Sequence, residues 1–317
     1  MLLPDIDAVQ RAACSIKPYI HHTPVLSSRL INEMLGCRIS FKCENFQRVG
    51  AFKMRGATNA VLNLEQPGSV TGVITHSSGN HAAALALAAS LNDLPCQVVM
   101  PEDTPAIKQD AVRSYGAQVT LCAPGMAARQ TITAEIMQRD SGLRLVHPYD
   151  DYDVIAGQAT ATLEFLQQVE SLDMLILPVG GGGLIAGASI VVGANQPGAE
   201  LYGVEPEAVD EARRSIMAGE PLAATGKPTI ADGLQAGIGK RNFQLIQRGV
   251  KEIVTVSEGQ IKDALRLVFE RLKIVIEPSA AVPLAAISAG QINMKDCHVG
   301  IILSGGNIDL ERMQKFI

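Results

Sequence analysis

Residues 174–194 constrain the fold of this chain more than any other stretch, because they include no charged side chain. An uncharged run of this length is long enough to cross a membrane as a helix. However, Pro178 and the four consecutive glycines at 180–183 would break such a helix near its middle. The stretch therefore predicts a buried strand, a glycine loop and a buried helix in series, with no membrane span.

The same alternation of short apolar runs, turns and helical patterns continues along most of the chain. Strands are expected at residues 38–43, 72–76, 97–100, 118–121, 143–146, 174–179, 201–204, 252–256 and 299–303. Helices are expected at residues 5–16, 57–64, 80–91, 105–115, 125–139, 152–169 and 184–194, and between a Ser27 or Ser28 cap and Gly36. Two more are expected after a Ser257 cap and, as a short helix, after residues 304–307. Strands that alternate with helices require crossover connections, which build mostly parallel sheets covered on both faces. The predicted fold class is α/β.

Charge and cysteine usage exclude several classes of protein. The net charge is -5, the pI is about 5.7 and no basic stripe is present, so we expect neither a nucleic-acid partner nor an anionic membrane partner. The six cysteines are scattered without metal-ligand spacing, which is typical of free thiols in a reducing compartment. The N-terminus lacks the basic region of a secretory signal, so we expect a cytoplasmic protein.

Three turns rich in glycine and serine follow predicted strands, at residues 77–80, 180–183 and 304–307. Parallel sheets bind ligands at the carboxyl ends of their strands. The three turns therefore predict one shared site.

The glycine loop at 180–183 opens a predicted helix. Its backbone N–H groups can approach an anion, and the helix dipole favours a phosphate there. No Gly-Lys-Ser/Thr follows, so it is not a Walker loop. Gly181, Gly183 and Ala186 also fit a relaxed dinucleotide fingerprint, with Glu205 about where a ribose-binding acid would lie. Close packing of strand on helix is a third explanation of the glycines.

Lys53 lies between Phe52 and Arg55, where a loop becomes a helix. The helix dipole, and Arg55 if its charge lies nearby, disfavour the ammonium form. A neutral amine is what Schiff-base chemistry with an aldehyde needs. The alternative is an ordinary solvated lysine at a helix start.

Polar side chains at the other two turns suit a small anionic ligand with a ring. The residues Ser77, Ser78, Asn80 and His81 offer hydroxyls, an amide and helix-start N–H groups, which suit a carboxylate and a ring hydroxyl. A serine-rich helix cap plus a turn is the alternative. Ser304 can donate to a ring nitrogen or belong to an ordinary turn.

Four carboxylates occur within seven residues at Glu205, Glu207, Asp210 and Glu211. Oxygens this close can hold a hard cation such as Mg²⁺ or Ca²⁺. A solvated acidic loop is the alternative.

Together these residues resemble one family closely, the fold type II pyridoxal-phosphate enzymes of the tryptophan synthase β-like group. The segments that match, in the family's order, are KCENFQRVGAFKMRGA, THSSGNHAAALA, LPVGGGGLIAG, GVEPE, TIADGL and LSGGN. The chain is most similar to the part of the family that holds serine racemases, threo-3-hydroxyaspartate dehydratases and catabolic serine or threonine dehydratases. It stops soon after LSGGN, so we expect no C-terminal regulatory domain.

The resemblance implies two open, mostly parallel twisted sheets flanked by helices. It implies a large domain of residues 1–70 and 150–317, a small domain of residues 71–149 and an active site in the cleft between them. It also implies a homodimer, a divalent cation and ATP as an effector.

The resemblance further implies roles for individual residues. Lys53 would hold the cofactor covalently and act as the base on its own face, while Ser78 would act on the opposite face. The implied cofactor-binding residues are Phe52, Lys53, Asn80, Gly180, Gly181, Gly182, Gly183 and Ser304. The implied substrate-binding residues are Ser77, Ser78, Asn80, His81 and Arg129. The implied cation site is made of Glu205, Glu211 and the carbonyl of Val209, and Glu211 stands where the eukaryotic racemases carry aspartate.

The function implied is a pyridoxal-phosphate-dependent dehydratase of serine, threonine or threo-3-hydroxyaspartate, giving a 2-keto acid and ammonia. Serine racemisation is expected as a companion or main activity, because both reactions begin with loss of the α-proton. Two alternatives are a Rossmann-type nicotinamide enzyme built on Gly181, Gly183 and Glu205, and a non-catalytic amino-acid sensor.

Overall fold

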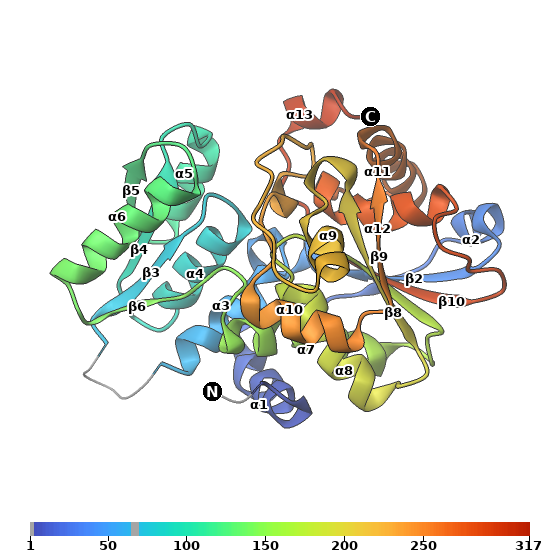
Figure 1. Cartoon of the computed structure of the whole chain (residues 1–317), viewed down its shortest axis with the longest axis horizontal. Helices are drawn as coiled ribbons and strands as arrows, with labels where there is room; N and C mark the ends of the chain where they lie inside the picture. The colour runs from blue at the N-terminus through green and yellow to red at the C-terminus, as the bar shows by residue number, and fades with distance from the viewer. Residues whose placement is uncertain (1–2, 65–69) are drawn as a thin grey trace.

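The computed structural model describes residues 3–64 and 70–317, and these form two sheets flanked by helices (Figure 1). The larger sheet has the order β1-β2-β10-β7-β8-β9 and consists of β1 (Val25–Leu26), β2 (Arg38–Cys43), β7 (Met174–Pro178), β8 (Glu200–Pro206), β9 (Glu252–Val256) and β10 (His298–Leu303). The smaller sheet has the order β5-β4-β3-β6 and consists of β3 (Gly72–His76), β4 (Cys96–Pro101), β5 (Gln118–Cys122) and β6 (Leu143–Leu145). Among the described strands every pairing except that of β1 with β2 is parallel, which confirms the predicted fold class.

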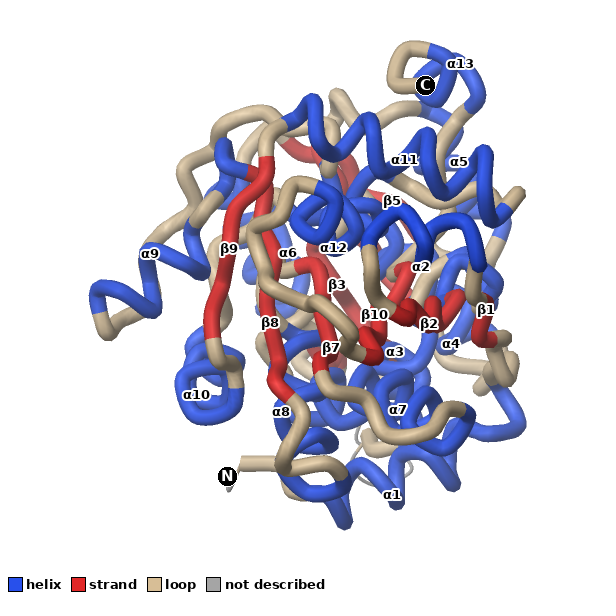
Figure 2. The backbone as a smooth tube through the Cα atoms, turned by 90° about the vertical axis from the view of Figure 1, so that its right-hand side faces the viewer, coloured by secondary structure: helices blue, strands red, loops and turns tan. Residues whose placement is uncertain are grey.

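Helices cover both faces of the larger sheet (Figure 2). The helices whose apolar residues pack on one face are α11 (Glu258–Leu272) and α12 (Pro278–Ser288). Those on the other face are α7 (Tyr152–Gln168), α8 (Gly183–Asn195) and α10 (Lys240–Gly249), with α1 (Ile6–Ile16) outside α7 and α8. Along β7, Ile176 belongs to the first core while Leu175 and Leu177 belong to the second. An apolar strand buried on both faces is what a parallel sheet requires.

The smaller sheet is covered in the same way, and the remaining helices lie at the edges and ends. The helices packed on its two faces are α4 (Asn80–Ser90), α5 (Ala106–Ser114) and α6 (Met126–Arg139). The other helices are α2 (Arg29–Leu35), α9 (Glu211–Ala218) and α13 (Leu310–Gln314). Short 3-10 turns occur at η1 (Lys17–Tyr19), η2 (Glu44–Phe46), η3 (Arg48–Gly50), η4 (Glu207–Val209) and η5 (Asp232–Leu234).

Helix α3 (Lys53–Leu62) lies between the two sheets and packs on α7 and α4. It begins at Lys53, so the predicted start at residue 57 is wrong. Gly56 suggests a loop by its low helix propensity, but it lies inside the helix because α7 approaches closely: a Cβ at Gly56 would lie 2.7 Å from the carbonyl oxygen of Val154. The contact is mutual, since a Cβ at Gly157 would lie 2.6 Å from the Cα of Gly56. Helix α8 approaches α7 in the same way, through Gly187.

Most predicted elements are confirmed, and the bounds of β2, β3 and β9 match the prediction. Four elements were not predicted: β1, α9, α10 and α12. Helix α12 is apolar on every side and contains Pro283, so it shows no helical periodicity. The division into domains at 70/71 and 149/150 stays a prediction, and residues 65–69 beside its first boundary lie outside the described residues. Across the described ranges, no helix has the length and apolar character needed to cross a membrane.

Candidate active site

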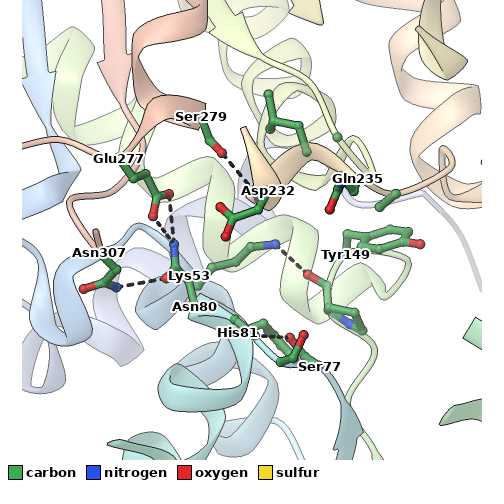
Figure 3. A pocket seen from close by; sticks show the side chains of 18 of the residues that line it. Lys53, Ser77, Asn80, His81, Tyr149, Asp232, Gln235, Glu277, Ser279 and Asn307 are labelled. Carbon is green, nitrogen blue, oxygen red and sulfur yellow. Dashed lines mark hydrogen bonds between the residues drawn. The ribbon is translucent and has the colours of Figure 1, made fainter. Parts of the chain in front are cut away.

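A cavity of about 380 Å³ lies where the carboxyl ends of β3, β7 and β10 face one another (Figure 3). It is lined by Ser77, Ser78, Gly79 and Asn80 after β3, by the glycine loop 180–183 after β7, and by Ser304 after β10. The expected convergence of the three turns on one site is therefore confirmed. The cavity is also lined by Phe52, Lys53, His81 and Arg129.

Lys53, the first residue of α3, extends its amine into this cavity. Its Nζ donates to the carbonyl oxygen of Pro148 at 2.9 Å and lies 5.0 Å from the centre of the Phe52 ring. Burial lowers the pKa of Lys53 to about 8, although the carboxylate of Glu277 opposes the shift. A neutral amine is therefore accessible near neutral pH, as the sequence analysis expected.

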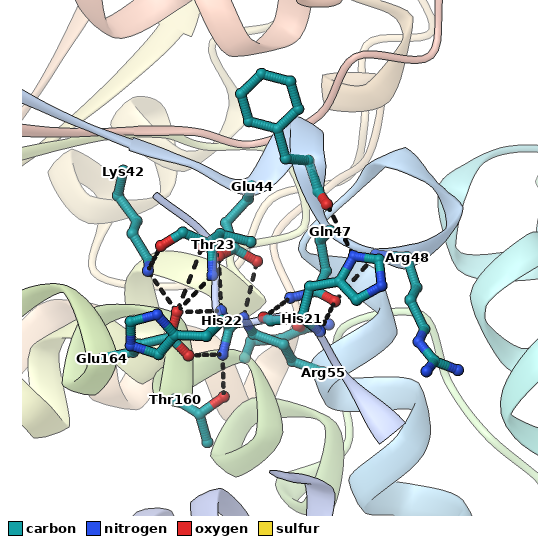
Figure 4. A network of polar contacts seen from close by, with 12 residues as sticks. His21, His22, Thr23, Lys42, Glu44, Gln47, Arg48, Arg55, Thr160 and Glu164 are labelled. Atoms are coloured by element: carbon teal, nitrogen blue, oxygen red, sulfur yellow. Dashed lines mark hydrogen bonds and ion pairs between the residues drawn. The ribbon is translucent and has the colours of Figure 1, made fainter. Parts of the chain in front are cut away.

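The cause of that shift is not Arg55, so this part of the prediction is wrong. The guanidinium of Arg55 is fully buried and lies among Glu44, Glu164 and Thr160 (Figure 4). It donates to both carboxylate oxygens of Glu44, at 2.8 and 2.7 Å, and to both of Glu164, at 3.1 Å each. Lys42 donates to Glu164 as well. This network of two cations and two carboxylates neutralises Arg55 and fixes the first turn of α3, which carries Lys53.

The glycine loop presents a helix start to the cavity. Gly182 has a φ of 91° and is the N-cap of α8, whose first turn has no side-chain cap among the described residues. The carbonyl of Gly181 accepts from the backbone N–H of Gly239 at 3.1 Å and from Nδ2 of Asn242 at 2.6 Å. This carbonyl therefore does not occupy the N–H groups of the loop. A Cβ at Gly181 would lie 2.3 Å from the ring of Tyr149. Free N–H groups at the positive end of a helix fit a phosphate.

The start of α4 offers a second anion site. The N-cap is Gly79, and no serine side chain caps the helix in the described structure, so the alternative of a serine-rich cap is wrong. Ser77 Oγ instead accepts from Gly79 N at 3.4 Å. His81 is buried, with its Nε2 3.2 Å from the carbonyl oxygen of Val146. The first N–H groups of α4 thus remain available to a carboxylate.

Ser304 and Arg129 complete the predicted lining. Ser304 is 3% exposed and its backbone carbonyl accepts from Phe52 N at 3.1 Å, which ties the end of β10 to the lysine loop. Arg129, on α6, makes no ion pair with an acid in the described part of the chain. Its Nε contacts only the carbonyl of Gly125, at 3.4 Å. The cavity therefore has an unneutralised cation on the α6 side.

These groups fit pyridoxal phosphate part by part. An amine of lowered pKa suits the aldehyde, the uncapped glycine loop suits the phosphate, and the Asn80 amide and the Ser304 hydroxyl suit the ring oxygen and the ring nitrogen.

The predicted cation residues lie outside this cavity. Both oxygens of Glu205 accept backbone N–H groups at 2.9 Å, from Ala212 and Arg213, so Glu205 does not serve the glycine loop as a ribose-binding acid. Burial raises the pKa of Glu205 to about 8, and Glu211 adds to the shift. Glu211 accepts from the backbone of Thr225 with one oxygen, while its other oxygen is buried without a partner among the described residues.

Within residues 3–64 and 70–317, no three or more His, Cys, Asp or Glu side chains are grouped to bind a metal ion. Both oxygens of Glu205 already accept N–H groups, so a hard cation here would depend on the second oxygen of Glu211 and on carbonyl oxygens such as that of Val209.

Several residues of the cavity were not predicted. Asp232 pairs with Lys108 of α5 at 3.0 Å and with Arg312 of α13 at 2.9 Å, which links the two sheets across the cavity. Tyr149 and Glu277 also line it. Asp232 belongs to the TIADGL segment, which could have indicated it, whereas Tyr149 and Glu277 carry no local signal.

Comparison with known proteins places these residues in context. The sequence profile described as "Pyridoxal-phosphate dependent enzyme" matches residues 16–305. The chain is 45% identical to a serine racemase of Dictyostelium discoideum, over 98% of this chain and 96% of that one. It is 43% identical to a beta-hydroxyaspartate dehydratase of Paracoccus denitrificans, over 99% of each. The solved structure of maize serine racemase superposes with a TM-score of 0.95 at 37% identity, covering 99% of this chain and 97% of that one.

Proposed function

This chain belongs to the family of pyridoxal-phosphate-dependent enzymes, and we propose that it is a dehydratase that converts small β-hydroxy amino acids into a 2-keto acid and ammonia. The observation that carries the proposal is the amine of Lys53, which faces a cavity with an uncapped helix start. When bound, the cofactor supplies the electron sink for cleavage at Cα. The likeness to a beta-hydroxyaspartate dehydratase and to serine racemases supports the reaction class.

Lys53 Nζ is the group that removes the α-proton. Its pKa of about 8 lies close to neutral pH, where a base both accepts and returns a proton efficiently. The contact with the carbonyl of Pro148 holds the amine at one place in the cavity. The buried network around Arg55 keeps its helix fixed.

The start of α4 binds the substrate's α-carboxylate. Ser77, Asn80 and His81 lie at this helix start, and Gly79 leaves its N–H groups free. Binding there would fix one end of the substrate and direct its Cα–H bond toward Lys53.

We propose that the preferred substrate carries a second carboxylate, as threo-3-hydroxyaspartate does. Arg129 lines the cavity without an acidic partner in the described structure. A charge-assisted hydrogen bond to it would contribute about 1.5–3 kcal/mol, enough for a preference of tenfold or more over serine and threonine. The hydroxyl on the neighbouring carbon then leaves with a proton as water, and hydrolysis of the released enamine gives the 2-keto acid and ammonia.

Racemisation of serine is the second candidate function. Ser78 lines the same cavity, and its hydroxyl makes no hydrogen bond to another side chain in the parts of the chain described. A hydroxyl that is free in this way is available to return a proton to Cα from the side opposite Lys53.

A substrate panel tests the proposal. Purified protein should be yellow, with a visible band that borohydride bleaches. It should release 2-keto acid from threo-3-hydroxyaspartate, L-serine and L-threonine, and D-serine should be followed in the same reactions, with and without Mg²⁺. Lys53→Ala should lose both the covalent adduct and turnover, and a Lys53→Ala protein that still turns over these substrates would overturn the role of Lys53.

We also propose a divalent cation at Glu205, Glu211 and the Val209 carbonyl, and ATP as an effector. The unpartnered oxygen of Glu211 supports the cation, and the ATP proposal rests on the family resemblance. A cytoplasmic homodimer remains our proposal, and the free cysteines support a reducing compartment.

A further inference from the structure

Glu277 is a buried acid of the cavity to which the mechanism above gives no role. It is the N-cap residue of α12 and is 5% exposed. An acid at a helix start normally accepts from the first N–H groups of its own helix. In the described structure the Glu277 side chain makes no such bond, and Pro278 follows at the first helical position. Its carboxylate turns into the cavity instead (Figure 3).

The carboxylate of Glu277 fixes the orientation of Asn80. Asn80 Nδ2 donates to both of its oxygens, at 3.0 and 3.1 Å. At the other end of the amide, Asn80 Oδ1 accepts from Asn307 Nδ2 at 2.9 Å, and Asn307 Nδ2 also donates to the carbonyl of Val49 at 2.7 Å. The carbonyl of Val49 can only accept, so it fixes Asn307 Nδ2 as the donor and Asn80 Oδ1 as the acceptor. The other end of the Asn80 amide, Nδ2, is therefore the donor that faces Glu277.

This assignment leaves one kind of contact for a ligand. One Nδ2–H directed between the two oxygens of Glu277 satisfies both contacts, and Oδ1 of Asn80 is occupied by Asn307. The second Nδ2–H then remains for the cavity. Asn80 is thereby held as a donor, which suits the ring oxygen assigned to it.

Glu277 also acts on Lys53 through its charge. It is the carboxylate that raises the pKa of Lys53 against the effect of burial. Burial raises the pKa of Glu277 itself to about 7 and Asp232 of η5 adds to the shift, whereas Asn80, Lys108 of α5 and the backbone N–H of Asn307 oppose it. Glu277 and Lys53 line the same cavity.

We propose that Glu277 is a positioning residue that holds Asn80 as a hydrogen-bond donor to the cofactor. Its charge, in the cavity that it shares with Lys53, is a second effect of the same side chain. The proposal rests on the function proposed above, because it concerns a cofactor bound at Lys53. Glu277 acts through its neighbours and is not assigned a contact with the reacting atoms.

The test compares the holoenzyme with Glu277→Gln and Glu277→Asp variants in two measurements. The first is the pH midpoint at which the visible absorbance of the bound cofactor changes. The second is the dissociation constant of pyridoxal phosphate. In Glu277→Gln the charge is lost, so the midpoint should fall by about one pH unit. In Glu277→Asp the charge remains but the shorter side chain loses Asn80, so the midpoint should stay within about 0.3 pH unit while the dissociation constant rises roughly tenfold.

Glu200→Gln is the control for loss of one carboxylate, since Glu200 pairs with Lys251 outside the cavity. It should leave both quantities unchanged. An unchanged midpoint in Glu277→Gln, or an unchanged dissociation constant in Glu277→Asp, would overturn the proposal. If Glu277→Gln does not fold, the dissociation constant of pyridoxal phosphate in Glu277→Asp alone tests the proposal. A wild-type protein without a visible cofactor band would instead refute the proposed function, so the two failures are distinguishable.

Discussion

Glu164→Gln tests whether the buried ion network stabilises the helix that carries Lys53. Glu164 is 13% exposed and accepts from Arg55 and Lys42, whose side chains are almost completely buried. Burial alone would raise the pKa of Glu164, but Arg55 and Lys42 outweigh it and lower the pKa from 4.5 to about 2. Each tenfold change in proton affinity corresponds to about 1.4 kcal/mol, so the ionised carboxylate contributes about 3 kcal/mol to folding.

The pH dependence has a definite sign. The pKa of Glu164 is lower in the folded state, so its contribution is complete above about pH 4.5 and is lost as the pH falls through about 2. Glu164→Gln should therefore lower the free energy of unfolding by about 3 kcal/mol at pH 7, and the difference from wild type should shrink steadily below pH 4.5.

Urea unfolding of the two proteins, followed by circular dichroism between pH 7 and the lowest pH at which both refold, measures this difference. Glu170→Gln is the matched control, because Glu170 pairs with Arg38 at the surface, where both side chains are more than half exposed. An exposed pair of this kind contributes at most about 1 kcal/mol. A loss in Glu164→Gln that is no larger than in Glu170→Gln, or that does not vary with pH, would refute the reasoning.

Three further substitutions examine the cavity. Gly181→Ala would place a Cβ 2.3 Å from the Tyr149 ring, so the dissociation constant of pyridoxal phosphate should rise about tenfold, whereas Gly193→Ala, with no neighbouring atom within 4 Å, should leave it unchanged. Ser78→Ala should abolish formation of D-serine while keeping part of the keto-acid release, and equal loss of both products would argue against a separate group on the second face. Arg129→Met should lower kcat/KM for threo-3-hydroxyaspartate by about tenfold and leave that for L-serine within about threefold, and a parallel loss for both substrates would exclude a contact with the second carboxylate.

The parts of the site that sequence reasoning located are those with a local signature. A glycine run or a serine turn directly after an apolar strand marks a strand end, and parallel strands bring such ends to one edge. Residues 77–80 and 180–183 and Ser304 meet at one cavity for this reason. The start of the lysine helix was misplaced by four residues because Gly56 reads as a helix breaker, and only the neighbouring helix explains why it is tolerated.

The parts that sequence reasoning missed depend on contacts between distant segments. Asn80 and Glu277 are 197 residues apart, and Arg55 and Glu164 are 109 residues apart. No local pattern reports that two such side chains meet. Arg55 is an example. Its place near Lys53 in the sequence suggested that its charge lowers the pKa of Lys53, but its buried carboxylate partners neutralise that charge.

The glycine contacts between α3 and α7 have a mechanical consequence. A backbone that rests directly on another backbone has no side chain between them to change rotamer, so the contact cannot be compressed or slide without breaking. Gly56 and Gly157 thus hold the first turn of α3, which carries Lys53, rigidly against α7. A side chain added at either glycine would push α3 away from α7 and would carry the Lys53 amine with it.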